Sequence, residues 1–241
     1  MILGAIPARW GATRFPGKPL AEIAGRPLIA WVVEAARRAR TLDAIVVVTD
    51  HEEIARAAVV AGSRGVVIDR KAASGTDRIA QLLAQDAASA GARIVVNIQA
   101  DEPLLEPDAI DASVVALQSD PGADIATLAR LLRSGELADD PNLVKVVAAD
   151  NGRALYFSRS PIPHGSATPS IHVGLYAYRR AAFDRFVSTA PTSLERVERL
   201  EQLRALELGL VISVVPFDSR SIGVDAPGDV ARVEAALSDT S

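Results

Sequence analysis

The chain has 241 residues, no cysteine, 49% hydrophobic residues and a formal net charge of −4. This composition excludes disulfides and thiolate metal sites, and it argues against disorder and against nucleic acid as a general partner. No apolar run approaches the roughly 20 residues of a membrane span, and the amino terminus lacks a signal-peptide pattern. We therefore expect a cytoplasmic protein with no membrane partner, folded as one large α/β domain or as one domain with a small appendage.

The first loop concentrates positive charge at the end of a predicted strand. Residues 2–6 form an apolar run typical of a buried strand, and the loop after it contains Arg9, Gly11, Arg14, Gly17 and Lys18. The glycines allow tight turns that bring backbone N–H groups close to an anion, while the cations supply charge. Ligands bind at this end of strands in open α/β sheets, so the loop predicts a triphosphate site, with a solvated surface loop as the alternative. It is not a P-loop, because a proline and not a hydroxyl residue follows the lysine.

Two strand-to-helix junctions come next. Residues 44–48 predict a buried strand, after which Asp50 is placed to cap a helix together with Glu53, and His51 is interpreted as a surface residue. Residues 66–68 predict a short strand, and the Ser-Gly-Thr-Asp-Arg segment at 74–78 precedes a helical pattern. Such a turn caps a helix, and its free N–H groups also suit an anion or the edge of a base.

Acidic side chains follow two other predicted strands. The apolar strand 93–98 leads to Asp101, and the strand 211–215 is followed by Asp225. A carboxylate that faces three cations indicates a divalent metal between the acid and the phosphates, with Mg²⁺ the usual oxygen-seeking ion. The alternative for Asp101 is a salt bridge to an arginine of the first loop, and the alternative for Asp225 is a helix N-cap.

The second half changes to shorter strands. After a helix over 106–118, the pattern predicts strands that form hairpins, at 125–128, 143–148 and 153–157, with Tyr156 and Phe157 in the core. From Ser193 the spacing predicts one helix whose apolar residues face inward, namely Leu194, Val197, Leu200 and Leu203. Glu201 falls on the same apolar face, where a carboxylate needs a partner, and the other charged residues are interpreted as surface pairs.

These motifs, spread over nearly the whole chain, resemble those of the CMP-Kdo synthetase family, the 3-deoxy-manno-octulosonate (Kdo) cytidylyltransferases. The matching segments are the first loop, residues 74–78, Gln-Ala-Asp-Glu-Pro at 99–103, residues 142–147 and 154–159, Ile-His-Val-Gly-Leu-Tyr at 171–176, Glu201-Gln202, and Gly-Val-Asp-Ala-Pro at 223–227.

The resemblance implies a nucleotidyltransferase (Rossmann-like) three-layer α/β fold with a mostly parallel central sheet and a smaller mixed-sheet lobe. It implies one cytidylyltransferase domain over 1–241, with nucleotide binding mainly in 1–130, an acceptor and dimer lobe in 131–220 and a closing metal-binding turn and helix in 221–241. The implied reaction transfers CMP from CTP to an acidic acceptor, most simply Kdo, with release of pyrophosphate. Mg²⁺ is the implied cofactor, and the implied assembly is a homodimer.

The resemblance also implies residue roles. The nucleotide-binding residues are Ala8, Arg9, Gly11, Arg14, Lys18, Ser74, Gly75, Thr76, Arg78, Gln99 and Asp101. The catalytic residues are Arg9, Lys18, Asp101 and Asp225, the last two also holding the metal. The acceptor-binding residues are Gln99, Arg159, His172, Tyr176, Glu201 and Gln202.

Three departures from the family pattern concern the acceptor. Ala100 stands where the family has glycine, Ile171 stands where it has arginine, and the loop 161–170 is short. We expect a narrower acceptor pocket and weaker use of Kdo, and an acceptor such as a small phosphonate is the alternative. A regulator that has lost catalysis would be expected to lose a metal acid, whereas both Asp101 and Asp225 are present.

Overall fold

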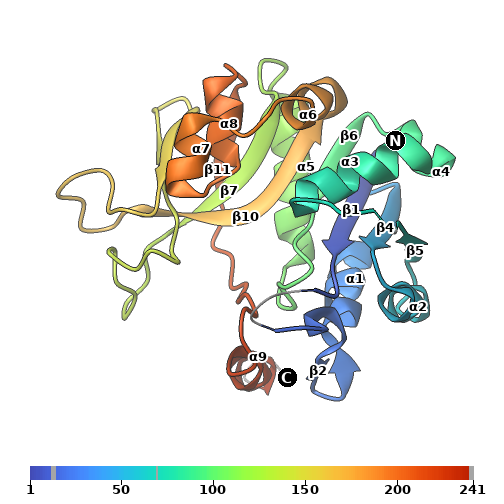
Figure 1. Cartoon of the computed structure of the whole chain (residues 1–241). Helices are drawn as coiled ribbons and strands as arrows, with labels where there is room; N and C mark the ends of the chain where they lie inside the picture. Colours follow the sequence, from blue (N-terminus) through green and yellow to red (C-terminus); the bar gives the residue numbers. More distant parts are fainter. Residues whose placement is uncertain (12–14, 69, 239–241) are drawn as a thin grey trace. The chain divides into compact units, whose positions relative to one another are not determined.

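The computed structural model of the chain describes residues 1–11, 15–68 and 70–238 (Figure 1). The chain divides into two compact units, Met1–Asp111 with Arg220–Ser241, and Ala112–Ser219. Within the described ranges, no helix has both the length and the apolar character needed to cross a membrane. The strands that each unit contributes are described in turn.

The sheet of the first unit contains four parallel strands. Their order is β6 (Ile94–Asn97), β1 (Ile2–Ala8), β4 (Ala44–Thr49) and β5 (Arg64–Val67). Strands covered on both faces are apolar along their length, and the side chains of Leu3, Val46 and Val95 are fully buried. The buried strands predicted from the sequence are therefore confirmed, and β5 begins two residues before its predicted start.

Helices cover both faces of this sheet. The chain steps from β1 to β4 to β5 in one direction, through α1 (Leu28–Arg38) and α2 (Glu52–Val60), and α3 (Gly75–Gln85) returns it to β6 on the other side of β1. Because such crossovers are right-handed, α1 and α2 lie on one face and α3 lies on the other (Figure 1). The strand order reverses between β1 and β6, which is where an open α/β sheet binds its ligand.

Small elements complete the first unit. A 3₁₀ helix, η1 (Lys18–Leu20), leads into the hairpin of β2 (Glu22–Ile23) and β3 (Arg26–Pro27). The two-residue turn of this hairpin has positive φ at Ala24 and Gly25, as a type I′ turn requires. The sequence analysis did not predict η1, this hairpin or the short α4 (Ala87–Ala90). The C-terminal α9 (Asp229–Ser238) is tied to the hairpin, since Ala24 N donates to Glu234 Oε1 at 2.8 Å.

The second unit contains a mixed sheet. β11 (Ile212–Pro216) is parallel to β7 (Ile125–Leu131), whereas β10 (Ser170–Arg179) is antiparallel to both β7 and β8 (Lys145–Ala148). β8 also pairs with β9 (Ala154–Ser158), and the predicted change to antiparallel pairing is confirmed. α5 (Pro107–Ser119) leads into this unit, and α6 (Arg180–Val187) follows β10.

The single helix predicted from Ser193 is wrong. The structure has α7 (Ser193–Glu198) and α8 (Gln202–Glu207), separated by Arg199 in the left-handed conformation with φ of 55°. Leu194 and Val197 face solvent instead of the core, with exposed fractions of 37% and 82%.

One ion pair in this region is buried, contrary to the prediction that its charged residues pair at the surface. Arg204 on α8 donates to both carboxylate oxygens of Glu195 on α7, and the two side chains are only 7% and 9% exposed. The pair joins the helices across the break at Arg199.

Candidate active site

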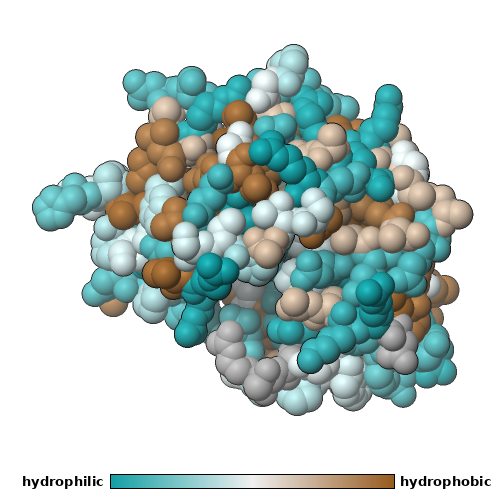
Figure 2. Space-filling view, turned by 45° about the horizontal axis from the view of Figure 1, so that its top comes forward, coloured by the Kyte–Doolittle hydropathy of each residue, from teal (hydrophilic) through white to brown (hydrophobic). Residues whose placement is uncertain are grey.

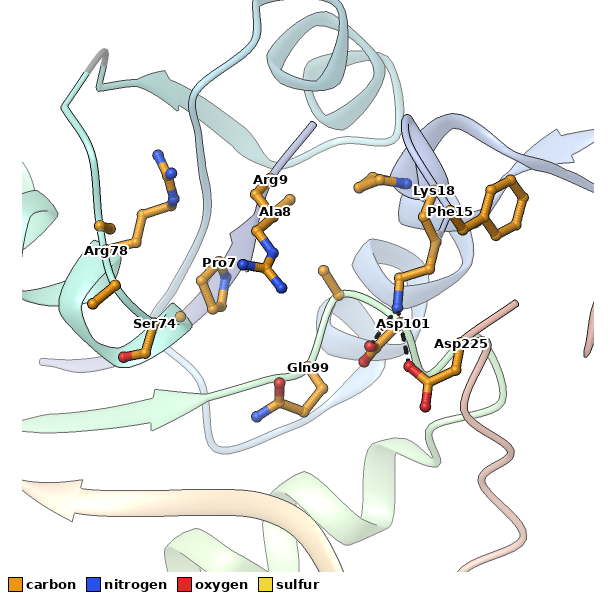
Figure 3. Close-up of a pocket in the computed structure, with 15 residues that line it drawn as sticks. Pro7, Ala8, Arg9, Phe15, Lys18, Ser74, Arg78, Gln99, Asp101 and Asp225 are labelled. Atoms are coloured by element: carbon orange, nitrogen blue, oxygen red, sulfur yellow. Dashed lines mark hydrogen bonds and ion pairs between the residues drawn. The ribbon is translucent and has the colours of Figure 1, made fainter. Parts of the chain in front are cut away.

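A pocket of about 520 Å³ opens in the first unit at the carboxyl ends of β1 and β6. Figure 3 shows its lining: Ala8, Arg9, Phe15 and Lys18 from the first loop, Ser74, Gly75 and Arg78 from the start of α3, Gln99, Ala100 and Asp101 after β6, and Asp225. The structure thus brings together the four segments to which the sequence analysis assigned the nucleotide and the metal. Gly11 is exposed on the same loop, and Arg14 lies outside the described residues.

Lys18 is the centre of the charged cluster in this pocket. Its Nζ lies 2.7 Å from Asp101 Oδ2 and 3.6 Å from Asp225 Oδ1, and it donates to the carbonyl oxygen of Val224 at 2.7 Å (Figure 3). The lysine side chain is only 14% exposed. The alternative predicted for Asp101 was a salt bridge to an arginine of the loop; among the described residues Asp101 pairs with Lys18, and Arg14 lies outside them.

Asp225 does not cap the following helix, so that alternative is wrong. The carboxylate of Asp229 accepts the backbone N–H groups of Asp225 and Ala226, each at 2.9 Å. These bonds lower the pKa of Asp229 and fix the backbone at Asp225, whose own carboxylate is directed toward Lys18. Val224 N also donates to the carbonyl oxygen of Asp101 at 2.9 Å, which holds the two acids side by side.

The two acids fit a divalent cation. Their carboxylate oxygen atoms are the ligands that Mg²⁺ prefers in proteins. The described part of the chain contains no group of three or more potential metal-ligating side chains. Mg²⁺ is usually held by one or two carboxylates together with substrate phosphates and water.

The turn before α3 forms the other wall of the pocket. Ser74 caps the helix in a box with Asp77, since each side chain accepts a backbone N–H from the other residue at 3.1–3.2 Å. A Cβ on Gly75 would come within 3.0 Å of Pro7 Cγ, so this position lets the helix start approach β1 closely. Thr76 is not among the residues that line the pocket; it is buried, and its Oγ1 accepts from Asn97 Nδ2 at 3.3 Å.

Asp50 is a residue that the sequence analysis assigned wrongly. His51 caps α2, because its Nδ1 accepts from Glu53 N, and Asp50 is left available for other partners. Its carboxylate accepts from Trp10 N at 2.9 Å and from Arg78 Nη2 at 3.0 Å. The only signal in the sequence was its position directly after a central strand.

Glu102 has a shifted pKa that was not predicted from the sequence. Burial raises the pKa of Glu102 to about 7, the neighbouring charge of Asp101 adds to the rise, and a hydrogen bond from Ser221 Oγ at 2.9 Å opposes it. Its place beside Asp101 in the Asp-Glu-Pro segment was the available signal.

The residues assigned to the acceptor are divided between the units. Gln99 lines the pocket of the first unit, beside Ala100, whose φ is not positive, so the backbone there accepts a methyl group. Arg159 has different partners from those expected of an acid-binding cation. Its guanidinium donates to the carbonyl oxygens of Glu198, Pro141 and Arg199, which uses most of its donors within the chain.

His172 and Tyr176 lie on one face of β10, with ring centroids 5.2 Å apart. The hydroxyl of Thr127 donates to Leu175 O at 2.8 Å and lies 2.9 Å from His172 Nε2. Since this hydroxyl has one proton, we assign the Nε2–H tautomer, which leaves Nδ1 as a hydrogen-bond acceptor. Burial lowers the pKa of His172 to about 3, so the ring is neutral near pH 7.

Glu201 immediately precedes α8, at the break after Arg199, and Gln202 is the first residue of the helix and is buried. The prediction that Glu201 lies on the apolar face of one long helix is wrong, because the helix is interrupted between Glu198 and Gln202.

The interpretation of Ile171 as a lost acceptor contact is not supported by its position. Ile171 is only 3% exposed, and alternation along β10 places it on the face opposite to His172 and Tyr176. The side chain belongs to the core, so this departure does not by itself reduce the surface available to an acceptor.

Comparison with known proteins settles the family. The family model described as Cytidylyltransferase matches residues 3–212. The chain belongs to the cytidylyltransferase family. It is 50% identical over 237 residues to 3-deoxy-manno-octulosonate cytidylyltransferase of Anaeromyxobacter dehalogenans, an alignment that covers 96% of both chains. It is 44% identical over 246 residues to the protein of the same name from Bdellovibrio bacteriovorus, with 98% of both chains covered.

A solved structure shows the same fold for this cytidylyltransferase. The structure of CMP:2-keto-3-deoxy-manno-octonic acid synthetase complexed with CTP matches with a TM-score of 0.92 at 33% identity, covering 100% of this chain and 99% of that one. The predicted α/β nucleotidyltransferase fold, with a mostly parallel sheet and a smaller mixed sheet, is confirmed. The resemblance read from the motifs is confirmed as well.

Proposed function

We propose that this cytidylyltransferase transfers CMP from CTP to Kdo and releases pyrophosphate. The observation that carries the proposal is the Lys18, Asp101 and Asp225 cluster, which shares one pocket with the Ser74–Arg78 turn in a chain closely similar to Kdo cytidylyltransferases. In the reaction an acceptor hydroxyl oxygen bonds to the α-phosphorus of CTP. The bond from that phosphorus to the β-phosphate oxygen breaks, and pyrophosphate leaves with the electron pair.

The residues of the first loop act by positioning and charge. Arg9 and Lys18 line the pocket and supply cationic donors for the triphosphate, while Ser74, Gly75 and Arg78 offer hydrogen-bond donors to the cytosine on the other side of the same pocket. Phosphoryl-type transfers depend mainly on such alignment and on neutralising charge that develops on the leaving group. Among these groups Lys18 has the most fixed position, because its ammonium contacts the carboxylates of Asp101 and Asp225.

We assign a Mg²⁺ site to Asp101 and Asp225. Bound there, the ion would polarise the phosphates and help to orient the acceptor oxygen. The contribution of the chain is to hold the two carboxylates together, through Asp229 on one side and the backbone bond between Val224 and Asp101 on the other.

Within the second unit we assign acceptor binding to His172, Tyr176, Glu201 and Gln202, whose imidazole, phenol, carboxylate and amide groups suit a polyhydroxylated acid. The neutral His172 would accept a hydrogen bond from an acceptor hydroxyl at Nδ1 rather than bind the carboxylate as a cation.

We further propose a homodimer formed through the second unit. Leu155 on β9 and Val197 on α7 are 59% and 82% exposed, and β9 pairs with only one of the described strands, β8. Figure 2 shows apolar side chains, in brown, that interrupt the hydrophilic surface. Exposed apolar groups beside an unpaired strand edge favour association with a second copy.

A pyrophosphate-release assay tests the reaction. We expect turnover with CTP and Kdo in the presence of Mg²⁺, much slower turnover with UTP, ATP or GTP, and little with small phosphonates as acceptors. Equal rates with all four nucleotides would show that the Ser74–Arg78 turn does not read the base. Faster turnover of a phosphonate than of Kdo would overturn the acceptor assignment.

A further inference from the structure

We infer that Asp50 is a positioning residue for CTP, coupling the base-binding side of the pocket to the phosphate-binding loop. The inference rests on the proposed function, and it concerns a residue that does not itself line the pocket. Asp50 follows the carboxyl end of β4, the strand between β1 and β5. From there its side chain reaches both the first loop and α3.

Both carboxylate oxygens of Asp50 are engaged with pocket elements. Oδ1 accepts from Trp10 N at 2.9 Å, and Oδ2 accepts from Arg78 Nη2 at 3.0 Å. The side chain of Arg78 is 6% exposed, and its other amino group donates to Ile68 O at 3.3 Å. A guanidinium held at two points by a carboxylate and a carbonyl has little freedom to turn, so its remaining donors keep one orientation toward the base.

The contact with Trp10 fixes the start of the phosphate-binding loop. Trp10 O accepts from Gly17 N at 2.9 Å, which joins the loop's beginning to the residue before Lys18. The indole ring stacks on His51 with a centroid distance of 4.1 Å and an interplanar angle of 15°, and a Cβ on Gly17 would come within 3.4 Å of it. The Asp50 carboxylate therefore connects Trp10 to the end of β4, and the hydrogen bond between Trp10 and Gly17 connects Trp10 to the residue before Lys18.

This arrangement predicts a particular kinetic effect. Without the carboxylate, Arg78 loses an ionic partner and the loop loses its anchor, so CTP binds to a less ordered site. Once CTP is bound, its contacts restore much of that order, and the chemical step at Lys18, Asp101 and Asp225 changes little. The loss should therefore appear in the KM for CTP rather than in kcat.

The test is the Asp50→Asn variant, assayed by pyrophosphate release with CTP and Kdo. The amide keeps the shape and can still accept from Trp10 N, but it cannot neutralise Arg78. A hydrogen bond to a charged group lost in this way should raise the KM for CTP by about 10- to 100-fold. We expect kcat at saturating CTP and the KM for Kdo to stay near the wild-type values.

The matched control is Asp86→Asn. Asp86 ends α3 and pairs with Arg64 at 2.7 Å, away from the pocket lining. It tests whether loosening α3 is enough to weaken CTP binding, and we expect its KM for CTP to be unchanged. A rise equal to that of Asp50→Asn would overturn the inference, because the effect would then be one of general stability.

A double-mutant cycle tests the route through Arg78. In an Arg78→Gln background, Asp50→Asn should raise the KM for CTP by less than about 3-fold, because the pair is already broken. Full additivity of the two changes would show that Asp50 does not act through Arg78. If Asp50→Asn does not fold, Asp50→Glu takes its place, with a smaller increase expected from a displaced carboxylate and no increase contradicting the inference.

Calorimetric titration with CTP alone separates this inference from the proposed reaction. Weaker CTP binding by Asp50→Asn than by the wild type supports the inference even if neither protein turns over Kdo, a result that would refute only the acceptor. Equal CTP affinities for the two proteins would refute the inference while leaving the reaction standing.

Discussion

At the scale of single residues, the hydrogen-bond partners of each carboxylate determine its orientation in the site. Asp225 is directed toward Lys18 because Asp229 accepts the backbone N–H groups of Asp225 and Ala226. Asp50 reaches two walls of the pocket because His51 takes over the helix cap. Both acids follow strands, and a capping role was the simplest interpretation of each from the sequence. Residue type favours Asp50 over His51 as a cap, since Asp, Asn, Ser and Thr are the preferred caps, so the cap at His51 could not be predicted from residue type.

His172 gives a pH prediction at this scale. Its pKa of about 3 in the folded protein lies below the usual value of 6.5, because burial disfavours the charged ring. The unfolded chain therefore takes up a proton below pH 6.5 that the folded chain does not. The free energy of unfolding should fall as the pH drops from about 6.5 toward 3, by about 1.4 kcal/mol per pH unit, with no effect above this range.

Urea unfolding of the wild type and of His172→Gln between pH 7.5 and pH 4.5, taken as about the range accessible before general acid unfolding, measures this dependence. The variant should lose less stability on acidification than the wild type. The control is His164→Gln in the exposed 161–170 loop, which should keep the wild-type slope. Parallel curves for the wild type and His172→Gln would contradict the lowered pKa.

At the scale of elements, the break between α7 and α8 is the clearest limit of sequence reasoning. The residues from Ser193 onward are good helix formers, and local propensity favours one helix. The tertiary pairing of Glu195 with Arg204, and of Arg159 with carbonyl oxygens at the break, stabilises the interruption instead. The spacing of apolar residues along a helix does not predict such tertiary bonds. By contrast, the parallel strands of the first unit were predictable, because strands buried on both faces are apolar throughout.

The buried ion pair predicts a large stability loss. Glu195→Gln should lower the free energy of unfolding by about 3–5 kcal/mol, because the buried Arg204 would lose the carboxylate that accepts two of its hydrogen bonds. The double variant Glu195→Leu with Arg204→Met should cost less than the single change, since no charge is left unpaired. Urea unfolding measures both. As a control, Glu53→Gln at the exposed pair with Arg56 should change the stability by less than about 1 kcal/mol.

At the scale of the whole molecule, two compact units carry different parts of the proposed chemistry. The motifs assigned the nucleotide and the metal to residues of the first unit, where strand order brings their segments to one pocket. They also assigned an acceptor role to residues of the second unit, but individual partners such as those of Arg159 depend on packing that a motif does not encode.

The proposed dimer gives a prediction at the same scale. Val197→Glu places a charge on the apolar surface of α7 and should shift the protein toward the monomer, as measured by sedimentation velocity. Val60→Glu is the control, because Val60 on α2 of the first unit is 88% exposed and lies outside the proposed interface. A monomeric wild type, or a Val197→Glu variant that associates as tightly as the wild type, would contradict the assignment of this surface.

The most direct test of the central claim is a crystal structure of the protein with CTP and Mg²⁺. The account predicts cytosine against the Ser74–Arg78 turn, the triphosphate beside Arg9 and Lys18, and the ion on Asp101 and Asp225. Density for CTP outside this pocket, or a bound triphosphate whose metal ion touches neither acid, would contradict it.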